Sequence, residues 1–445
     1  MALKSRLQYS IATGIALAVF ALGMTSSIAT LSGIGLAAIV TLSASRCARL
    51  FQNELAFTRW ILGLIVTVSL LMIGGSAVYY TAVVTPFSVF WLVALLPFVS
   101  WILAERTSNH PQSPIELHTH SISSGVWFAL VILALTAFFV ILGDHSTVNP
   151  SRSPWLVVSP TILWGMAAAV LGLFFLVRRG SLRLSVAAAI AAAFAAVSIA
   201  LFVFPLGYGF DPFLHQATLD HIALNGTITP KPFYYIGQYA LELVVMLTTG
   251  ASSHTIDVFL VPVLMALLLP TVTATSLWHV TTRLLPASLA ALGTLLLPLA
   301  PFIHTTPQGL AILWSLLITF LALPHLASGY RLAPPWLLIV LSVAAVLTHP
   351  LAGLPALLFS LLVTVHTQSW SKLSRAIATA ILSIGGAIML PIAFLFSGPG
   401  SQLGWHPERI LHLLPPTFFG TRFDVVNDLL VILGTNLWIW MVLLA

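Results

Sequence analysis

The amino-acid sequence predicts an all-α integral membrane protein, and its composition is the main reason. Of 445 residues, 59% are hydrophobic and 6% are charged. A soluble fold cannot place so many apolar residues, because its surface grows with chain length and must stay polar. The single cysteine, Cys47, excludes an internal disulfide and a cysteine-rich metal cage. The sequence contains no P-loop, Gly-rich dinucleotide turn or basic-aromatic patch, so we expect no nucleic-acid partner.

Apolar segments of spanning length follow one another along the chain. A helix needs roughly 20 apolar residues to cross a bilayer, which gives about fourteen predicted spans. They lie near 9–25, 29–45, 60–80, 86–103, 124–142, 155–177, 184–205, 256–279, 285–303, 308–326, 335–349, 352–367, 376–396 and 427–445. We expect an N-terminal module of about six spans over 1–183, and a second part over 184–445 with outer loops at 206–254 and 397–426.

The basic residues indicate how the chain is oriented. If the apolar window 233–249 lies along the membrane face without crossing, 13 of the 17 Lys and Arg residues fall on one side. If the window crossed, the four basic residues between 283 and 375 would change sides, and the count would be nearly even. Cytoplasmic loops carry an excess of Lys and Arg. The pattern therefore favours an interfacial helix at 233–249, a cytoplasmic N-terminus and an outward-facing stretch before that helix.

The acidic residues have the opposite distribution. In this topology 8 of the 11 Asp and Glu residues lie outside or at the outer boundary. No Asp, Glu, Lys or Arg falls near the middle of a proposed span, where ion-coupled transporters usually place an ionisable group. We therefore expect the polar chemistry on the outer side, and the pattern weakens a transporter interpretation.

The stretch Gly207–Gly250 combines acids, histidines, aromatic residues and helix signals between apolar segments. Pro212 suits the first position of a helix, and Asp211 before it is a favoured N-cap. Asn225 and Gly226 supply a matching stop signal. We expect one short helix over 212–224 and a second over about 233–249.

The first of these helices carries the candidate catalytic residues. In a regular helix Asp211, His215 and Thr218 share one face, whereas Asp220 points to nearly the opposite face. A single site can therefore use Asp211 together with His215, or it can use Asp220, but hardly both. The alternatives are structural, since Asp211 can serve only as a helix cap and His215 can simply lie at the membrane interface.

Further candidates for binding a substrate lie on the second helix and in later outer loops. Tyr235, Tyr239 and Glu242 share a helix face, although tyrosines also anchor helices at membrane interfaces. His304 lies in an outer loop, and His349 lies at the tip of a hairpin with short arms. An anionic lipid head requires donors, and the basic residues on the outer side that we select for it are Lys231, Arg409 and Arg422. We assign no metal site, because the Glu116-Leu-His118-Thr-His120 cluster has no fixed scaffold around it.

The central stretch resembles the GT-C superfamily of membrane glycosyltransferases, which includes protein O-mannosyltransferases, aminoarabinose transferases and oligosaccharyltransferase catalytic subunits. In that superfamily a spanning helix opens into a first large outer loop. The loop has an acidic residue near its start, a juxtamembrane helix, a small-residue turn and an aromatic stretch after Lys-Pro. The matching residues here are Gly209-Phe210-Asp211, His215, Asn225-Gly226, Lys231-Pro232-Phe233-Tyr234-Tyr235 and Gly250, and more loosely His304 and Thr348-His349-Pro350. The resemblance covers about 200–445.

This resemblance implies a GT-C-like core that transfers a sugar from a polyprenyl-phosphate donor to a hydroxyl of an acceptor glycan, lipid or protein. Asp211 would act as the general base, with His215 orienting it or binding the acceptor. The scheme needs no cofactor beyond the lipid-linked donor. The expected location is the cell membrane, with the active-site loop outside the cytoplasm. Two alternatives stay open, namely a transporter or flippase for a lipid-linked solute, and a non-catalytic membrane scaffold.

Overall fold

The computed structural model describes residues 2–51, 54–105, 122–149, 151, 153–179, 181–229, 231–232 and 234–397. Every regular element in these ranges is helical. The sequence features expected at 106–121 and beyond residue 397 lie outside the described residues, and these include the Glu116–His120 cluster, Arg409 and Arg422.

Helices follow one another with short connections, as the alternation of apolar segments and turn residues predicts. The α-helices are α1 (Ala2–Ser26), α2 (Ala29–Cys47), α3 (Ala56–Thr81), α4 (Pro86–Glu105), α5 (Ile122–Gly143), α6 (Ile162–Arg178), α7 (Leu182–Val203), α8 (Asp211–Asn225), α9 (Ile236–Thr249), α10 (Ser253–Thr281), α11 (Leu284–Gly293), α12 (Pro307–Ser328), α13 (Pro335–Thr348), α14 (Pro350–Thr367) and α15 (Lys372–Ser397). Short 3-10 helices are η1 (Ala48–Phe51), η2 (Pro154–Leu156), η3 (Thr294–Leu296) and η4 (Ala300–Phe302).

Many of these helices have the length and composition of membrane spans. Within the described residues, nine of them are long and apolar enough to cross a membrane. Four further apolar helices, α6, α9, α11 with η3, and α13, are shorter. The chain is therefore a helical membrane protein of the multi-pass type, and the number of about fourteen spans stays a prediction.

One predicted span differs from the structure in a way that the sequence explains. The segment 285–303 was expected to be continuous, but α11 ends at Gly293 and only the two 3-10 turns η3 and η4 follow it. Pro298 and Pro301 lie in this part of the segment. Proline lacks the backbone N–H that an α-helix needs and clashes with the preceding turn, so the helix cannot continue. The break leaves residues 303–306 as a loop before α12.

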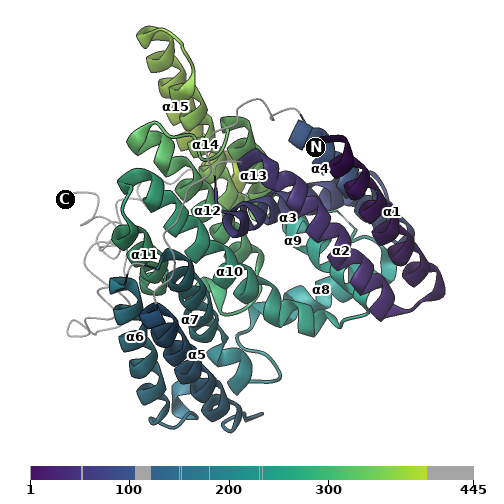
Figure 1. Ribbon diagram of the computed structural model, residues 1–445. Helices are drawn as coiled ribbons and strands as arrows, with labels where there is room; N and C mark the ends of the chain where they lie inside the picture. Colours follow the sequence, from purple (N-terminus) through teal and green to yellow (C-terminus); the bar gives the residue numbers. More distant parts are fainter. Residues whose placement is uncertain are drawn as a thin grey trace, which may run out of the picture. The chain divides into compact units, whose positions relative to one another are not determined.

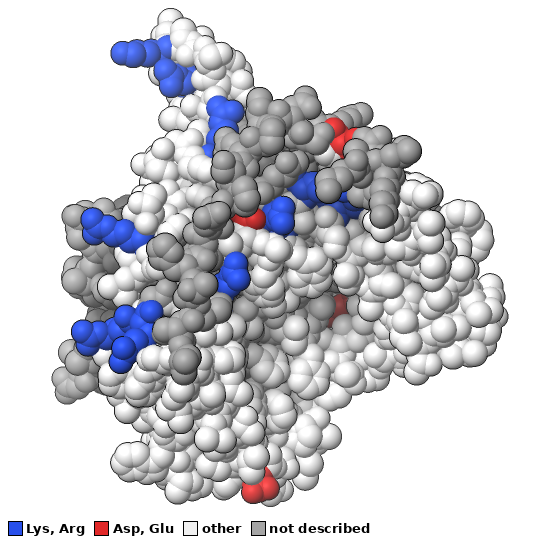
Figure 2. Space-filling model, in the orientation of Figure 1, with Lys and Arg blue, Asp and Glu red and all other residues white. Residues whose placement is uncertain are grey.

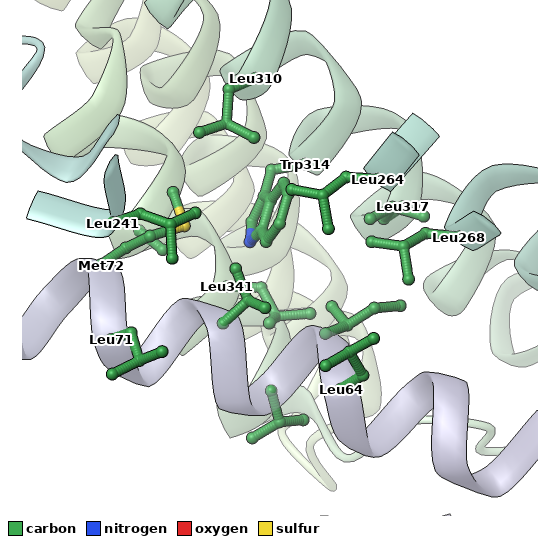
Figure 3. Packing of buried hydrophobic residues seen from close by; sticks show 14 of the residues in the cluster. Leu64, Leu71, Met72, Leu241, Leu264, Leu268, Leu310, Trp314, Leu317 and Leu341 are labelled. Carbon is green, nitrogen blue, oxygen red and sulfur yellow. The ribbon is translucent and has the colours of Figure 1, made fainter. Parts of the chain in front are cut away.

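A single large hydrophobic cluster joins helices from both sides of residue 183, where the sequence suggests a boundary. Figure 3 shows its centre, in which Leu71 and Met72 of α3 lie near Leu241 of α9 and Trp314 of α12. Trp314 is fully buried and its indole N–H donates to Ser69 Oγ at 2.7 Å. The chain divides into two compact units, but at a different place, with Met1–Ser383 as one and Ile384–Ala445 as the other.

Helix packing in the first unit explains how the central stretch is held. α9 packs against α2, α3 and α13, while α8 packs against α9 and α10. Figure 1 shows α9 beside α3, with α8 next to α10. α9 has 14 residues, and its length of about 21 Å is below the ~30 Å of a bilayer core. Most of its side chains are buried against other helices, and its position relative to the membrane stays a prediction.

Candidate functional site

The helix α8 has nearly the bounds that its end signals predict. Pro212 occupies the first turn, and Gly226 ends the helix with φ +73°, a conformation that favours glycine. The Gly226 carbonyl accepts a hydrogen bond from the Val84 N–H at 3.0 Å, which fixes the end of α8 against the connection between α3 and α4. The predicted N-cap is wrong, because Phe210 takes that position and Asp211 is already helical.

Asp211 is exposed at the start of α8. It lies in the first turn of α8. Its carboxylate makes no hydrogen bond and no salt bridge within the described part of the chain. This leaves both of its oxygens available for a bound molecule.

His215 lies one turn after Asp211 and is half-buried. Its Nδ1 forms a hydrogen bond of 2.7 Å with the hydroxyl of Tyr239. Burial lowers the pKa of His215 to about 4, an effect that Asp211 opposes and that His304 and His349 increase. At neutral pH the ring is therefore uncharged, and one ring nitrogen can donate while the other accepts.

His304 and His349 come from distant parts of the chain to the same place. A Cβ added to Gly209, which has φ +86°, would lie 3.6 Å from His304 Cε1, so this imidazole lies against the start of the α8 segment. Burial lowers the pKa of His304, and this effect exceeds the opposite effect of nearby Asp211, which raises that pKa. Burial likewise lowers the pKa of His349. The Nδ1 atoms of both rings are buried without a hydrogen-bond partner among the described residues, and such atoms usually have one.

Tyr235 connects these histidines. Its ring stacks on His349 with centroids 5.5 Å apart and an interplanar angle of 22°, and it meets His215 edge-on at 5.5 Å. The backbone explains this position, because Tyr235 has φ +72° and its N–H donates to the Thr348 carbonyl at 3.1 Å. The predicted helix 233–249 consequently begins only at Ile236. The start of α9 is thereby bound to the turn between α13 and α14.

A second polar layer lies behind this cluster. Glu242 is 1% exposed and accepts a hydrogen bond of 3.1 Å from the Gln238 side chain. Asp257 is 2% exposed and accepts a hydrogen bond of 2.9 Å from Gln216. The face shared by Tyr239 and Glu242 therefore leads from the exposed cluster into the protein, and Glu242 lies at the buried end of it.

Three of these residues did not enter the sequence-based site. Gln216 is next to His215 in the chain but points to Asp257, which the sequence marks only as one of the outer acids. The available signal was an acid in the first turns of an otherwise apolar helix, α10. For Gln238 the available signal was its spacing, because a residue four positions before Glu242 lies on the same helix face and can donate to it.

The predicted substrate-binding residue Lys231 has a structural role. Its ammonium donates to the carbonyls of Tyr79, Tyr80 and Ala82 at 2.7, 3.3 and 3.2 Å. These carbonyls end α3, so Lys231 caps that helix and its three donors are used. The structure thus brings together Asp211, His215, Tyr235, Tyr239, His304 and His349, places Glu242 behind them, and leaves Lys231 apart from them.

Neither a metal-binding group nor a similar known protein identifies the chemistry of this site. Among the described residues, no group of three or more His, Cys, Asp or Glu is arranged to hold a metal ion. The chain matches no protein-family model, no curated protein and no solved structure.

Proposed function

We propose that this protein is a membrane glycosyltransferase that moves a sugar from a polyprenyl-phosphate donor to an acceptor hydroxyl at the outer face of the cell membrane. The observation that carries the proposal is the position of Asp211. It is an exposed carboxylate at the start of α8, and it lies close enough to His215 and His304 to raise the pKa of both rings against the effect of burial. The resemblance of residues 200–445 to the GT-C superfamily supports the same reaction.

The proposed reaction is a nucleophilic substitution at the anomeric carbon of the donor sugar. The acceptor oxygen attacks the anomeric carbon, the bond from that carbon to the phosphate oxygen breaks, and the phosphate leaves with the electron pair. Asp211 takes the proton of the acceptor hydroxyl as it attacks. A carboxylate in this role contributes about 10²- to 10⁴-fold in rate.

The surrounding rings suit a sugar and a phosphate. Uncharged His304 and His349 each present a buried ring nitrogen without a partner, and such nitrogens can donate to phosphate oxygens or sugar hydroxyls. We no longer propose Lys231 as a phosphate ligand, because its ammonium donates to three backbone carbonyls. Arg409 and Arg422 keep their proposed role in holding the phosphate.

One observation favours the transporter as a second candidate. Glu242 and Asp257 are buried carboxylates in a membrane protein, and among the described residues neither has a basic partner. Ionisable groups inside membrane proteins often mark the route of an ion or a solute. The third alternative, a scaffold without catalytic activity, requires no use of Asp211.

Transfer from synthetic polyprenyl-phosphate sugars by the purified full chain tests the proposal. Asp211→Asn should reduce turnover by about 10²-fold or more, while Asp220→Asn, an exposed acid on the same helix, should leave turnover unchanged. Equal turnover of the wild type and Asp211→Asn would remove Asp211 as the base. Solute uptake into proteoliposomes that is lost in Glu242→Gln, with no sugar transfer by the wild type, would favour the transporter.

A further inference from the structure

A mostly apolar pocket lies at the ends of α7 and α10 that are remote from α8. Its volume is about 470 Å³, and its walls come from the starts of α3 and α7 and from the last turns of α10. That volume falls in the range of small-molecule sites, about 300–1,000 Å³. The lining includes Phe57, Leu182, Val186 and Trp278.

The pocket and the candidate site are separated by the thickness of a bilayer. Arg183 lines the pocket, and α7 continues from it to Val203, a rise of about 30 Å at 1.5 Å per residue. Along α10, Asp257 and the pocket residue Thr275 are separated by about 27 Å on the same measure. A bilayer core is about 30 Å thick. The pocket therefore opens near the membrane face opposite to α8.

One basic side chain, Arg183, and one acidic side chain, Glu54, line the pocket. Arg183 is exposed at the pocket, and its guanidinium has no acidic partner among the residues that the structure describes. Glu54 is the acid of the wall, but its carboxylate is held by His279 Nε2 at 2.6 Å and by the Tyr330 hydroxyl at 3.1 Å. Thr275 bonds its hydroxyl to its own helix at Thr271 and so adds little polarity.

Two further features make this end of the protein attractive to an anion. Both α3 and α7 begin at the pocket, and the first turn of a helix carries partial positive charge and free N–H groups. Arg178 and Arg179 lie just before α7 and are exposed. Figure 2 shows Lys and Arg side chains at several places on the upper and left parts of the visible face.

We propose that this pocket binds an anionic phospholipid, with one acyl chain among the apolar side chains and the phosphate on Arg183. An apolar cavity that opens at a membrane face is in contact with lipid chains, and an exposed guanidinium at its edge selects those with an anionic head. The proposal does not depend on sugar transfer, because the pocket lies at the opposite end of α7 and α10 from Asp211.

Quenching of tryptophan fluorescence by brominated lipid chains tests the proposal directly, because Trp278 is part of the wall. Delipidated full chain in detergent is titrated with phosphatidylglycerol or phosphatidylcholine that have the same brominated acyl chains. The wild type should show a saturable phase that is half-complete at about tenfold less phosphatidylglycerol, because the choline of phosphatidylcholine cancels the net negative charge that the guanidinium attracts. Trp278→Phe should remove that phase.

Two arginine-to-glutamine substitutions distinguish lipid binding in the pocket from a general attraction of anionic lipid to basic residues on the surface. Arg183→Gln should bring the two lipids to equal half-points, whereas Arg179→Gln, which alters an exposed arginine just before α7 that does not line the pocket, should keep the tenfold preference. Thermal unfolding checks that each variant is folded. Equal half-points in the wild type, or the same loss in both arginine variants, would overturn the proposal. Displacement by polyprenyl phosphate at lower concentration than by unbrominated phosphatidylglycerol would also overturn it, because the occupant would then be an isoprenoid.

Discussion

Replacing Gly237 with alanine tests how the start of α9 is held against the turn that carries His349. A Cβ at this position would lie 2.5 Å from Thr348 Oγ1 and 3.0 Å from Thr348 N, whereas ordinary contact begins at 3.4 Å. The shortfall at the hydroxyl is 0.9 Å, which is 3.4 minus 2.5. Thr348 cannot easily retreat, because it is fully buried and its hydroxyl is bonded to the Ala344 carbonyl at 2.9 Å.

The expected size of this effect comes from two opposing terms. Alanine in place of glycine stabilises a helix by about 0.5–1 kcal/mol, and forcing an extra methyl group into a packed site costs about 1–3 kcal/mol. The two ranges leave a net destabilisation of Gly237→Ala of about 0–2.5 kcal/mol, with a central value of about 1 kcal/mol. The matched control is Gly125→Ala in the first turn of α5, where nothing lies within 4 Å of the added Cβ, and which should be unchanged or slightly stabilised.

Thermal unfolding of the purified full chain in one detergent measures this difference. Gly237→Ala should unfold at a lower temperature than both the wild type and Gly125→Ala. Because His349 follows Thr348 directly, the displacement should also separate the rings of Tyr235 and His349 and reduce sugar transfer. If Gly237→Ala were as stable as Gly125→Ala, the close approach of α9 to Thr348 would be wrong.

Two further substitutions test the polar and apolar parts of the core. The pKa of His215 falls from 6.5 to about 4 on folding, so only the unfolded chain binds a proton between these values. The contribution of the neutral ring to stability is fully present above pH 6.5 and is lost as the pH falls towards 4. His215→Phe should therefore flatten the pH dependence of the unfolding temperature in this window, and parallel curves for the two proteins would contradict the assignment. Trp314→Phe should cost about 2 kcal/mol, through a lost hydrogen bond to Ser69 and a new cavity. Trp91→Phe, at a side chain that is 50% exposed, is its control, and equal effects of the two in thermal unfolding would refute the packing argument.

Local signals in the sequence predict those parts of the fold that depend on neighbours along the chain. Composition indicates a helical membrane protein, and Pro212 with Gly226 fixes the bounds of α8 within a residue or two. The segment 285–303 shows the limit of this approach. A count of apolar residues treats its prolines as part of a span, whereas the backbone ends α11 before them. The same limit applies to α9, whose start depends on a hydrogen bond from Tyr235 to a residue far away in the chain.

The candidate site shows the same division. Helical spacing alone places Asp211 and His215 one turn apart. The approach of His304 and His349 could only be suggested, because it depends on how α10, α12 and α13 pack. Lys231 illustrates the opposite error, since the sequence shows a free cation on an outer loop, and only the fold reveals the end of α3 that uses it. The pairing of Gln216 with Asp257 likewise needs the contact between α8 and α10.

The stacking of Tyr235 on His349 has a consequence for biosynthesis. A ribosome completes α8 and the start of α9 well before it makes α13, so a partly synthesised chain holds Asp211 and His215 without the ring and the carbonyl that position Tyr235. The cluster around Asp211 can form only after this late helical hairpin has been made and has packed against α9. Any delay in folding that hairpin would leave a nascent chain with α8 in place and the cluster incomplete.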